Sequence, residues 1–151
     1  MAPKNVIGLI AQFETSKGIA YSLCTHENAE YGTLIYLYPI GTQLLELKDA
    51  PTQFCCFFPL RIALRRNIVK EVGKMEIPSQ LKVFPVFRSG IPMEPNSTKV
   101  DCWWFWDGVK EWPVGEISDE QRKMPRSGIW NDTLIIERLE EGYTAEKDPL
   151  I

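Results

Sequence analysis

Histidine is almost absent from this sequence, and cysteine is sparse. His26 is the single histidine in 151 residues, and the four cysteines contain no CxxC spacing. A zinc enzyme built on histidine ligands is therefore excluded, and a Ser/His/Asp or Cys/His catalytic arrangement would need His26 as its base. Cys24 and His26, two residues apart, supply only two ligands, so we expect no metal and no cofactor. The cysteines are expected to be buried as small apolar side chains: Cys24, Cys55, Cys56 and Cys102.

Long apolar runs, phosphate-binding loops and strong net charge are also missing. No stretch approaches the roughly 20 apolar residues that span a bilayer, and the N-terminus lacks the apolar core and cleavage site of a signal peptide. Neither Gly-x-Gly-x-x-Gly nor the Walker lysine motif occurs. The net charge of −3 argues against a general nucleic-acid binder. We therefore expect a cytoplasmic protein that has neither nucleic acid nor a membrane as its partner.

The composition is typical of a globular protein, with 44% hydrophobic and 25% charged residues. The length predicts a single domain over 1–151, because domains most often have about 100–150 residues. Charge is unevenly distributed: residues 1–99 hold 11 Lys/Arg against 8 Asp/Glu, whereas residues 100–151 hold 6 against 12. This pattern fits two solvated faces of opposite sign, or an acidic C-terminal surface that attracts a basic partner.

The first two thirds of the chain alternate short β-leaning runs with polar or glycine-containing turns, which predicts antiparallel strands. We expect three consecutive strands over 6–13, 19–24 and 33–38, and a buried strand over 53–58. Residues 59–67 fit either a continuation of that strand or a short helical turn. Residues 68–77 alternate with a period of two, and Gly73 predicts a bulge or a close backbone approach. Residues 83–88 carry Pro85, which predicts an edge strand or a covering loop, and 89–99 form a loop by composition.

Residues 102–115 carry four of the five tryptophans. Asp107-Gly108 lies between two strand-like runs and predicts a hairpin. With a period of two, Trp104 and Trp106 face one side of the strand, while Trp103 and Phe105 face the other. Core packing accounts for most of these aromatic residues, and a partner-facing patch is the second interpretation.

The C-terminal part carries helix signals. Ser118 and Gln121 form the pattern of a capping box before a short helix that ends before Pro125. Asn131 or Asp132 can cap a second helix, residues 132–141 place apolar residues on one helical face, and Gly142 follows. This pattern favours a helix over a strand. The whole pattern predicts an α+β fold. We expect a mainly antiparallel, strongly bent sheet or a partly open SH3-like barrel, with one or two short C-terminal helices.

No catalytic constellation is visible, so the residues favour a binding protein over an enzyme. Carboxylate pairs such as Asp101 and Asp107 are commonplace at hairpin ends, and the acidity around the tryptophans would repel phosphates. Tryptophan often anchors protein interfaces, and acidic side chains speed association with a basic partner. The candidate partner-binding residues are Trp106, Asp107, Glu111, Trp112 and Glu116.

Two segments carry a family resemblance. Residues 103–115 contain Trp-Trp-Phe-Trp-Asp-Gly and then Glu-Trp-Pro-Val-Gly, and residues 128–143 read Gly-Ile-Trp-Asn-Asp-Thr-Leu-Ile-Ile-Glu-Arg-Leu-Glu-Glu-Gly-Tyr. Both resemble immunity protein family twenty-six of bacterial polymorphic toxin systems, some of whose members are labelled HocA-type phosphotriesterases. The runs over 8–13 and 18–23 are similar to the opening hairpin of that family, and residues 63–77 match loosely.

The resemblance implies an antitoxin that binds and blocks a cognate bacterial toxin, often a nuclease with a basic cleft. The phosphotriesterase label implies metal held by several histidines, which a chain with one histidine does not supply. The prediction is therefore a cytoplasmic immunity protein, a monomer or weak dimer, whose partner is a cognate toxin. The alternatives are a small phosphotriester or ester hydrolase, and a small-ligand or protein binding module that uses the tryptophan hairpin.

Overall fold

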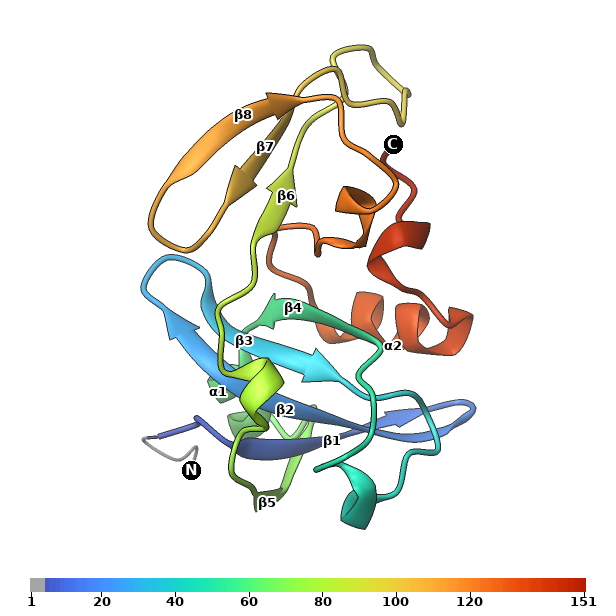
Figure 1. Cartoon of the computed structure of the whole chain (residues 1–151). Helices are drawn as coiled ribbons and strands as arrows, with labels where there is room; N and C mark the ends of the chain where they lie inside the picture. The colour runs from blue at the N-terminus through green and yellow to red at the C-terminus, as the bar shows by residue number, and fades with distance from the viewer. Residues whose placement is uncertain (1–4) are drawn as a thin grey trace. The chain divides into compact units, whose positions relative to one another are not determined.

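The computed structural model describes residues 5–151, which form two compact units. The first unit takes in the chain up to Val83 together with Gly128–Tyr143, and the second takes in Phe84–Ser127 and Thr144–Ile151. Each unit carries its own antiparallel sheet (Figure 1). The prediction of a single domain over 1–151 stays a prediction.

Five antiparallel strands form the sheet of the first unit, in the order β4-β3-β2-β1-β5. The predicted meander of three N-terminal strands is confirmed. β2 runs beyond the predicted 19–24, because a bulge between Cys24 and His26 carries the ladder on to Asn28. The bulge predicted at Gly73 is also confirmed, since the register with β1 shifts beside this residue. The strands are β1 (Leu9–Thr15), β2 (Gly18–Asn28), β3 (Gly32–Leu37), β4 (Phe54–Phe58) and β5 (Lys70–Lys74).

Two short α-helices complete the first unit. α1 (Leu60–Arg65) follows β4, so the helical alternative for residues 59–67 is correct. α2 (Asp132–Glu141) is the helix predicted near the C-terminus. The Asn131 side chain accepts a hydrogen bond from the Leu134 amide at 2.8 Å, and Gly142 ends the helix with a φ of 70°. The cap and stop signals in the sequence therefore have the geometry that they predict.

The second unit is built on three antiparallel strands in the order β6-β7-β8, and the predicted tryptophan hairpin is confirmed. The strands are β6 (Phe87–Ser89), β7 (Trp103–Trp106) and β8 (Glu111–Gly115). Ser118 and Gln121 exchange the two hydrogen bonds of a capping box, at 2.8 and 3.2 Å, but the helix after them is one 3-10 turn. The chain also forms the one-turn 3-10 helices η1 (Leu44–Glu46), η2 (Ser79–Leu81), η3 (Gln121–Lys123) and η4 (Ala145–Lys147).

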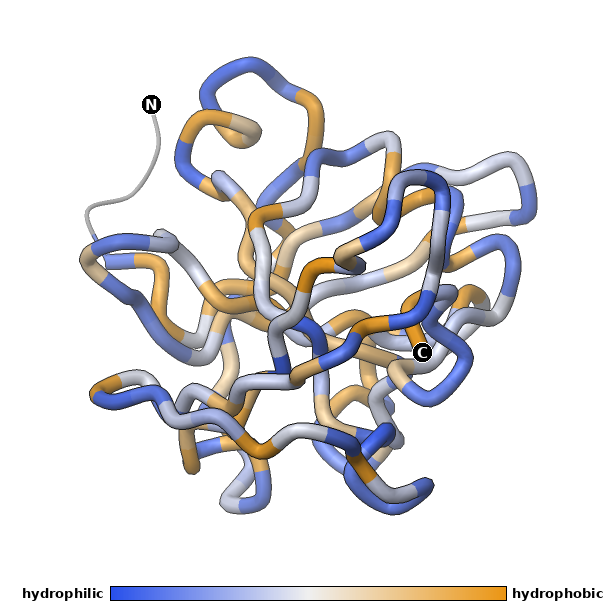
Figure 2. The backbone as a smooth tube through the Cα atoms, turned by 90° about the horizontal axis from the view of Figure 1, so that it is seen from above, coloured by the Kyte–Doolittle hydropathy of each residue, from blue (hydrophilic) through white to orange (hydrophobic). Residues whose placement is uncertain are grey.

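The α+β, mainly antiparallel class predicted from the sequence is confirmed. Neither sheet formed by residues 5–151 closes on itself, so the bent-sheet alternative describes the fold better than the barrel does. Hydrophobic and hydrophilic stretches alternate along the backbone (Figure 2). Of the helices in the described part of the chain, none is long and apolar enough to cross a membrane.

A fully buried arginine organises the second unit. Arg88 of β6 has no exposed surface, and its guanidinium donates to the carbonyls of Met124 and Ala145 at 3.1 and 2.8 Å. The same group lies 4.6 Å from the ring centre of Trp103, where a cation is attracted by the π-face. The backbone of Arg88 also bonds to Pro125 and Ser127. One residue thus holds three segments of the chain around the first residue of the tryptophan hairpin.

We expect Arg88→Met to lower the free energy of unfolding of the second unit by about 2 kcal/mol, because two buried carbonyls lose a charged donor. Arg122→Met is the matched control, since Arg122 is only half-buried and makes one long bond of 3.4 Å to the Leu150 carbonyl. Urea denaturation followed by tryptophan fluorescence measures both, because four of the five tryptophans lie in this unit. Equal midpoints for the two variants would contradict the assignment.

Candidate functional site

The two faces of strand β7 differ as the alternation predicts. Trp103 and Phe105 are 2% and 4% exposed, whereas Trp104 is 40% exposed. Successive residues of a strand point to opposite faces of the sheet, which explains why Trp103 is buried and Trp104 is exposed. The candidate site is the exposed face of this hairpin, which carries Trp104.

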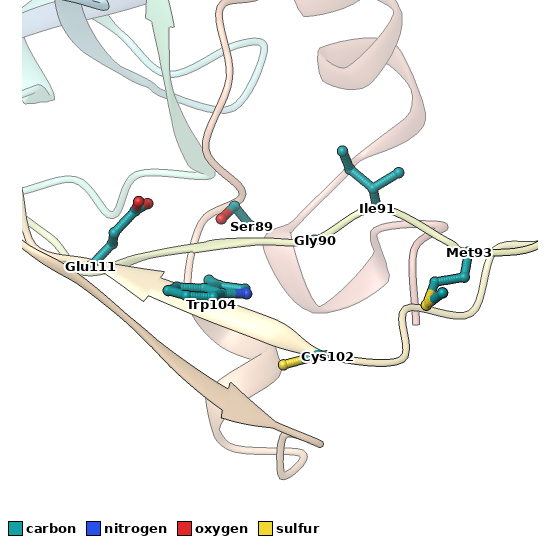
Figure 3. A pocket seen from close by; sticks show the side chains of 7 residues that line it. All are labelled: Ser89, Gly90, Ile91, Met93, Cys102, Trp104 and Glu111. Atoms are coloured by element: carbon teal, nitrogen blue, oxygen red, sulfur yellow. The ribbon is translucent and has the colours of Figure 1, made fainter.

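A pocket of about 470 Å³ lies against Trp104. Cross-strand pairing places Ser89 of β6 beside Trp104, and Glu111 of β8 beside the next residue on the same face, Trp106. Figure 3 shows the Trp104 ring between the Glu111 side chain at one end and the loop after β6 at the other. The lining residues are Ser89, Gly90, Ile91, Met93, Cys102, Trp104 and Glu111.

The loop after β6 supplies the apolar wall of the pocket. Ile91 and Met93 are 84% and 79% exposed, although both are large apolar side chains. Gly90 is needed for the path of this loop, because a Cβ there would lie 2.4 Å from Val100. The Val100 amide in turn donates to the carbonyl of the last residue, Ile151, at 2.6 Å. The exposed apolar residues are therefore held on an anchored segment.

Trp106 shares a face with Trp104 but serves mainly in packing. It lies 5.5 Å from Phe84 and 5.6 Å from Phe87, measured between ring centres, and it is half-buried. Trp112 pairs with Phe105 on the opposite face, at 6.2 Å in an edge-to-face contact, and is 37% exposed. Such aromatic contacts stabilise the hairpin beyond the area that they bury.

Asp107 closes the hairpin turn. Its Oδ1 accepts hydrogen bonds from the amides of Lys110 and Val109, each at 2.9 Å. These bonds favour the ionised form and lower the pKa of the Asp107 carboxyl from its ordinary value. The carboxylate is thereby engaged within the turn itself.

Exposed acidic side chains outnumber the exposed basic ones in the second unit, which are Lys99, Lys110, Lys123 and Lys147. Among its basic side chains, Arg88 is buried, Arg126 lies 2.9 Å from the buried carboxylate of Asp148, and Lys123 pairs with Glu120 at 3.1 Å. The acidic stretch seen in the sequence is divided between the two units, because α2 and its four carboxylates belong to the first unit. The exposed acids of the second unit include Glu94, Asp101, Glu111, Glu116 and Asp119.

The five residues predicted to bind a partner are therefore not one patch. Trp106 and Glu111 share the pocket face, Trp112 lies on the opposite face, Asp107 is in the turn, and Glu116 follows β8 as an exposed residue. Of the residues that line the pocket, only Glu111 was among those predicted to bind a partner. The period of two pointed to Trp104, but the loop composition carried no signal for Ile91 or Met93. The six omitted residues are Ser89, Gly90, Ile91, Met93, Cys102 and Trp104.

The expectation that all four cysteines are buried is wrong for Cys102. The other three are buried, whereas Cys102 is exposed and lines the pocket. It lies just before β7, next to the buried Trp103, and lines the pocket together with Trp104. The apolar character of cysteine therefore predicted burial for a residue, Cys102, that is exposed.

His26 lies within β2, beyond the strand that the sequence predicted over residues 19–24. Its Nδ1 is 2.8 Å from the Thr25 hydroxyl, and its Nε2 is 2.8 Å from the Lys82 carbonyl. Cys24 is buried beside it, and burial raises the pKa of that thiol to about 12. Over residues 5–151, no group of three or more His, Cys, Asp or Glu side chains is placed to hold a metal ion.

We expect the Asp107 turn to make stability pH-dependent. A lowered pKa in the folded state means that the carboxylate contributes stability above the ordinary value of 3.8, and that this is lost as pH falls through the folded pKa. Asp107→Asn should therefore unfold at lower urea than the unaltered chain at neutral pH, and the two curves should converge in acid. Asp119→Asn, in an exposed position outside the hairpin, should show no such trend. A constant difference across the pH series would contradict the assignment.

Thiol reactivity should separate Cys102 from the other cysteines. Burial raises the pKa of Cys24 and Cys55 to about 12 and that of Cys56 well above its usual range, and the thiolate is the reactive form. In the folded protein we expect a disulfide reagent such as Ellman's to modify one thiol rapidly and the rest only after denaturation. Cys102→Ser should remove the rapid phase. A rapid phase that survives this substitution would contradict the burial of the others.

Comparisons of the chain with protein-family models, with curated proteins and with solved structures find no match. The geometry and chemistry of the site therefore carry the functional conclusion.

Proposed function

We propose that this chain is an immunity protein that binds a cognate bacterial toxin in the cytoplasm and neutralises it. The observation that carries the proposal is the exposed apolar and aromatic face of the tryptophan hairpin. Trp104, Ile91 and Met93 are all exposed around one pocket. Large apolar side chains that gather on a surface are typical of an interaction site, and tryptophan often anchors one.

The arrangement of this face supports a preorganised binding surface. Trp104 lies on a strand whose other face is packed through Trp103 and Phe105, and the Asp107 turn closes the hairpin. An anchor that is already rigid loses little conformational freedom when a partner binds. The exposed acids of the same unit, Glu111 and Glu116 among them, favour a basic partner. A nuclease cleft built to hold phosphates is a partner of this kind.

A small-ligand binding module is the second candidate, because the pocket itself favours it. Its volume of about 470 Å³ lies within the roughly 300–1,000 Å³ that is usual for ligand sites. The hydrolase alternative gains no such support. Both ring nitrogens of His26 lie within hydrogen-bond distance of neighbouring oxygens, which leaves this residue poorly placed as a general base.

The proposal is tested with the tagged chain as bait in a lysate of the source bacterium, washed at low and then at high salt. The retained protein is identified and produced alone in a laboratory strain. We expect it to stop growth, and we expect co-expression of this chain to restore growth. Trp104→Ala should weaken the complex by at least about tenfold, as loss of an interface tryptophan commonly does.

Leu45→Ala is the matched control, because Leu45 is 98% exposed but belongs to the first unit. It should bind and protect like the unaltered chain. A retained protein that is harmless when produced alone would refute the immunity function. Full protection by Trp104→Ala would refute the assigned surface.

A further inference from the structure

The pocket on the tryptophan hairpin combines an aromatic face with an unengaged carboxylate. Glu111 lies opposite Trp106, and Trp104 is the next residue on that face, so Glu111 and Trp104 are diagonal neighbours across the two strands. Such neighbours have Cα atoms roughly 7–8 Å apart. Within residues 5–151, the Glu111 carboxylate takes part in no hydrogen bond or ion pair, unlike Glu120, which pairs with Lys123.

This spacing suits an organic cation. A guanidinium or ammonium is attracted by a tryptophan ring when it lies within about 6 Å of the ring centre. A group at that distance above Trp104 can also reach a carboxylate on the neighbouring strand. Figure 3 shows the Glu111 side chain and the Trp104 ring next to one another along the pocket. The chain already uses this kind of contact internally, since the guanidinium of Arg88 lies 4.6 Å from the ring centre of Trp103.

The remaining walls suit the stem of a long side chain. Ile91 and Met93 offer apolar surface, and the Ser89 hydroxyl adds one hydrogen-bonding group beside Trp104. Arginine has an apolar stem and a flat head, which stacks on aromatic rings and binds carboxylates with two parallel hydrogen bonds. Lysine has a compact, strongly hydrated head that fits this combination less well.

We propose that the pocket binds an arginine side chain that the partner protein presents. The guanidinium stacks on Trp104 and pairs with Glu111, while the stem packs against Ile91 and Met93. The inference rests on the proposed function only for the identity of the partner. The pocket and its preference for a guanidinium depend only on residues of this chain and not on which partner binds.

The test uses the whole chain and a capped Gly-Arg-Gly peptide, with citrulline and lysine versions for comparison. Citrulline keeps the shape of arginine but is neutral. In a ¹H–¹⁵N NMR titration, we expect the arginine peptide to shift the Trp104 indole signal and the Ser89 and Cys102 amides. Citrulline should bind at least about tenfold more weakly, because charge-assisted bonds to the carboxylate are lost.

Matched variants locate the binding. Glu111→Gln should weaken binding of the arginine peptide by at least about fivefold, because the ion pair is lost. Asp119→Asn, which removes an exposed carboxylate that does not line the pocket, should leave it unchanged. Trp104→Leu keeps an apolar residue at a surface position and should weaken binding, as read from the Ser89 and Cys102 amides.

Three results would overturn the proposal. One is the absence of any shift at about 20 mM peptide, where a site with a Kd of about 1 mM is nearly saturated. Another is equal binding of the arginine peptide and either comparison peptide. The third is equal weakening by Glu111→Gln and Asp119→Asn.

The outcome is separable from that of the proposed function. If the chain binds the arginine peptide but restores no growth, the proposal of an arginine pocket stands and the immunity function is refuted. If the chain restores growth through Trp104 but does not prefer the arginine peptide, the immunity function stands and the proposal of an arginine pocket is refuted.

Discussion

The second unit depends on the burial of one charged side chain. Both clusters of buried apolar residues belong to the first unit, so the hairpin unit has few apolar side chains to bury. Arg88 has no exposed surface in this unit. Its guanidinium donates hydrogen bonds to the carbonyls of Met124 and Ala145 and lies over the ring of Trp103. A buried cation is costly unless such partners surround it. The two carbonyls and the indole ring that contact the guanidinium thus bring separate segments of the chain together around it.

The candidate site lies on the face of β7 opposite to the one that packs against Arg88. Because Trp103 and Phe105 face inward, the alternation of the strand turns Trp104 outward. The Ser89 that follows Arg88 turns to the same face and lines the pocket beside Trp104. A packed interior on one face of the strand thus leaves the Trp104 ring exposed on the other. Preorganisation of this kind is what a binding surface needs if it is to lose little entropy on association.

Much of the fold followed from local signals in the sequence. The Asp107-Gly108 hairpin, the Asn131 and Gly142 limits of α2, and the bulge at Gly73 each depend on a few neighbouring residues, and each is present. The site was less accessible to prediction. Trp106 and Glu111 were named and lie on the pocket face, but Ile91 and Met93 belong to a loop whose path depends on Val100 and the C-terminal residue. Contacts between distant segments leave no local pattern.

The sequence by itself determined the period of β7, the turn that follows it and the excess of acids around it. These properties arise from side-chain alternation and from the backbone preferences of single residues. Only the tertiary structure decided that Cys102 is exposed, that His26 bonds to Lys82, and that the acidic C-terminal stretch is shared between two units. The reason is physical. Burial and charge environment are set by which segments meet in space, and that depends on packing over the whole chain rather than on any short stretch of it.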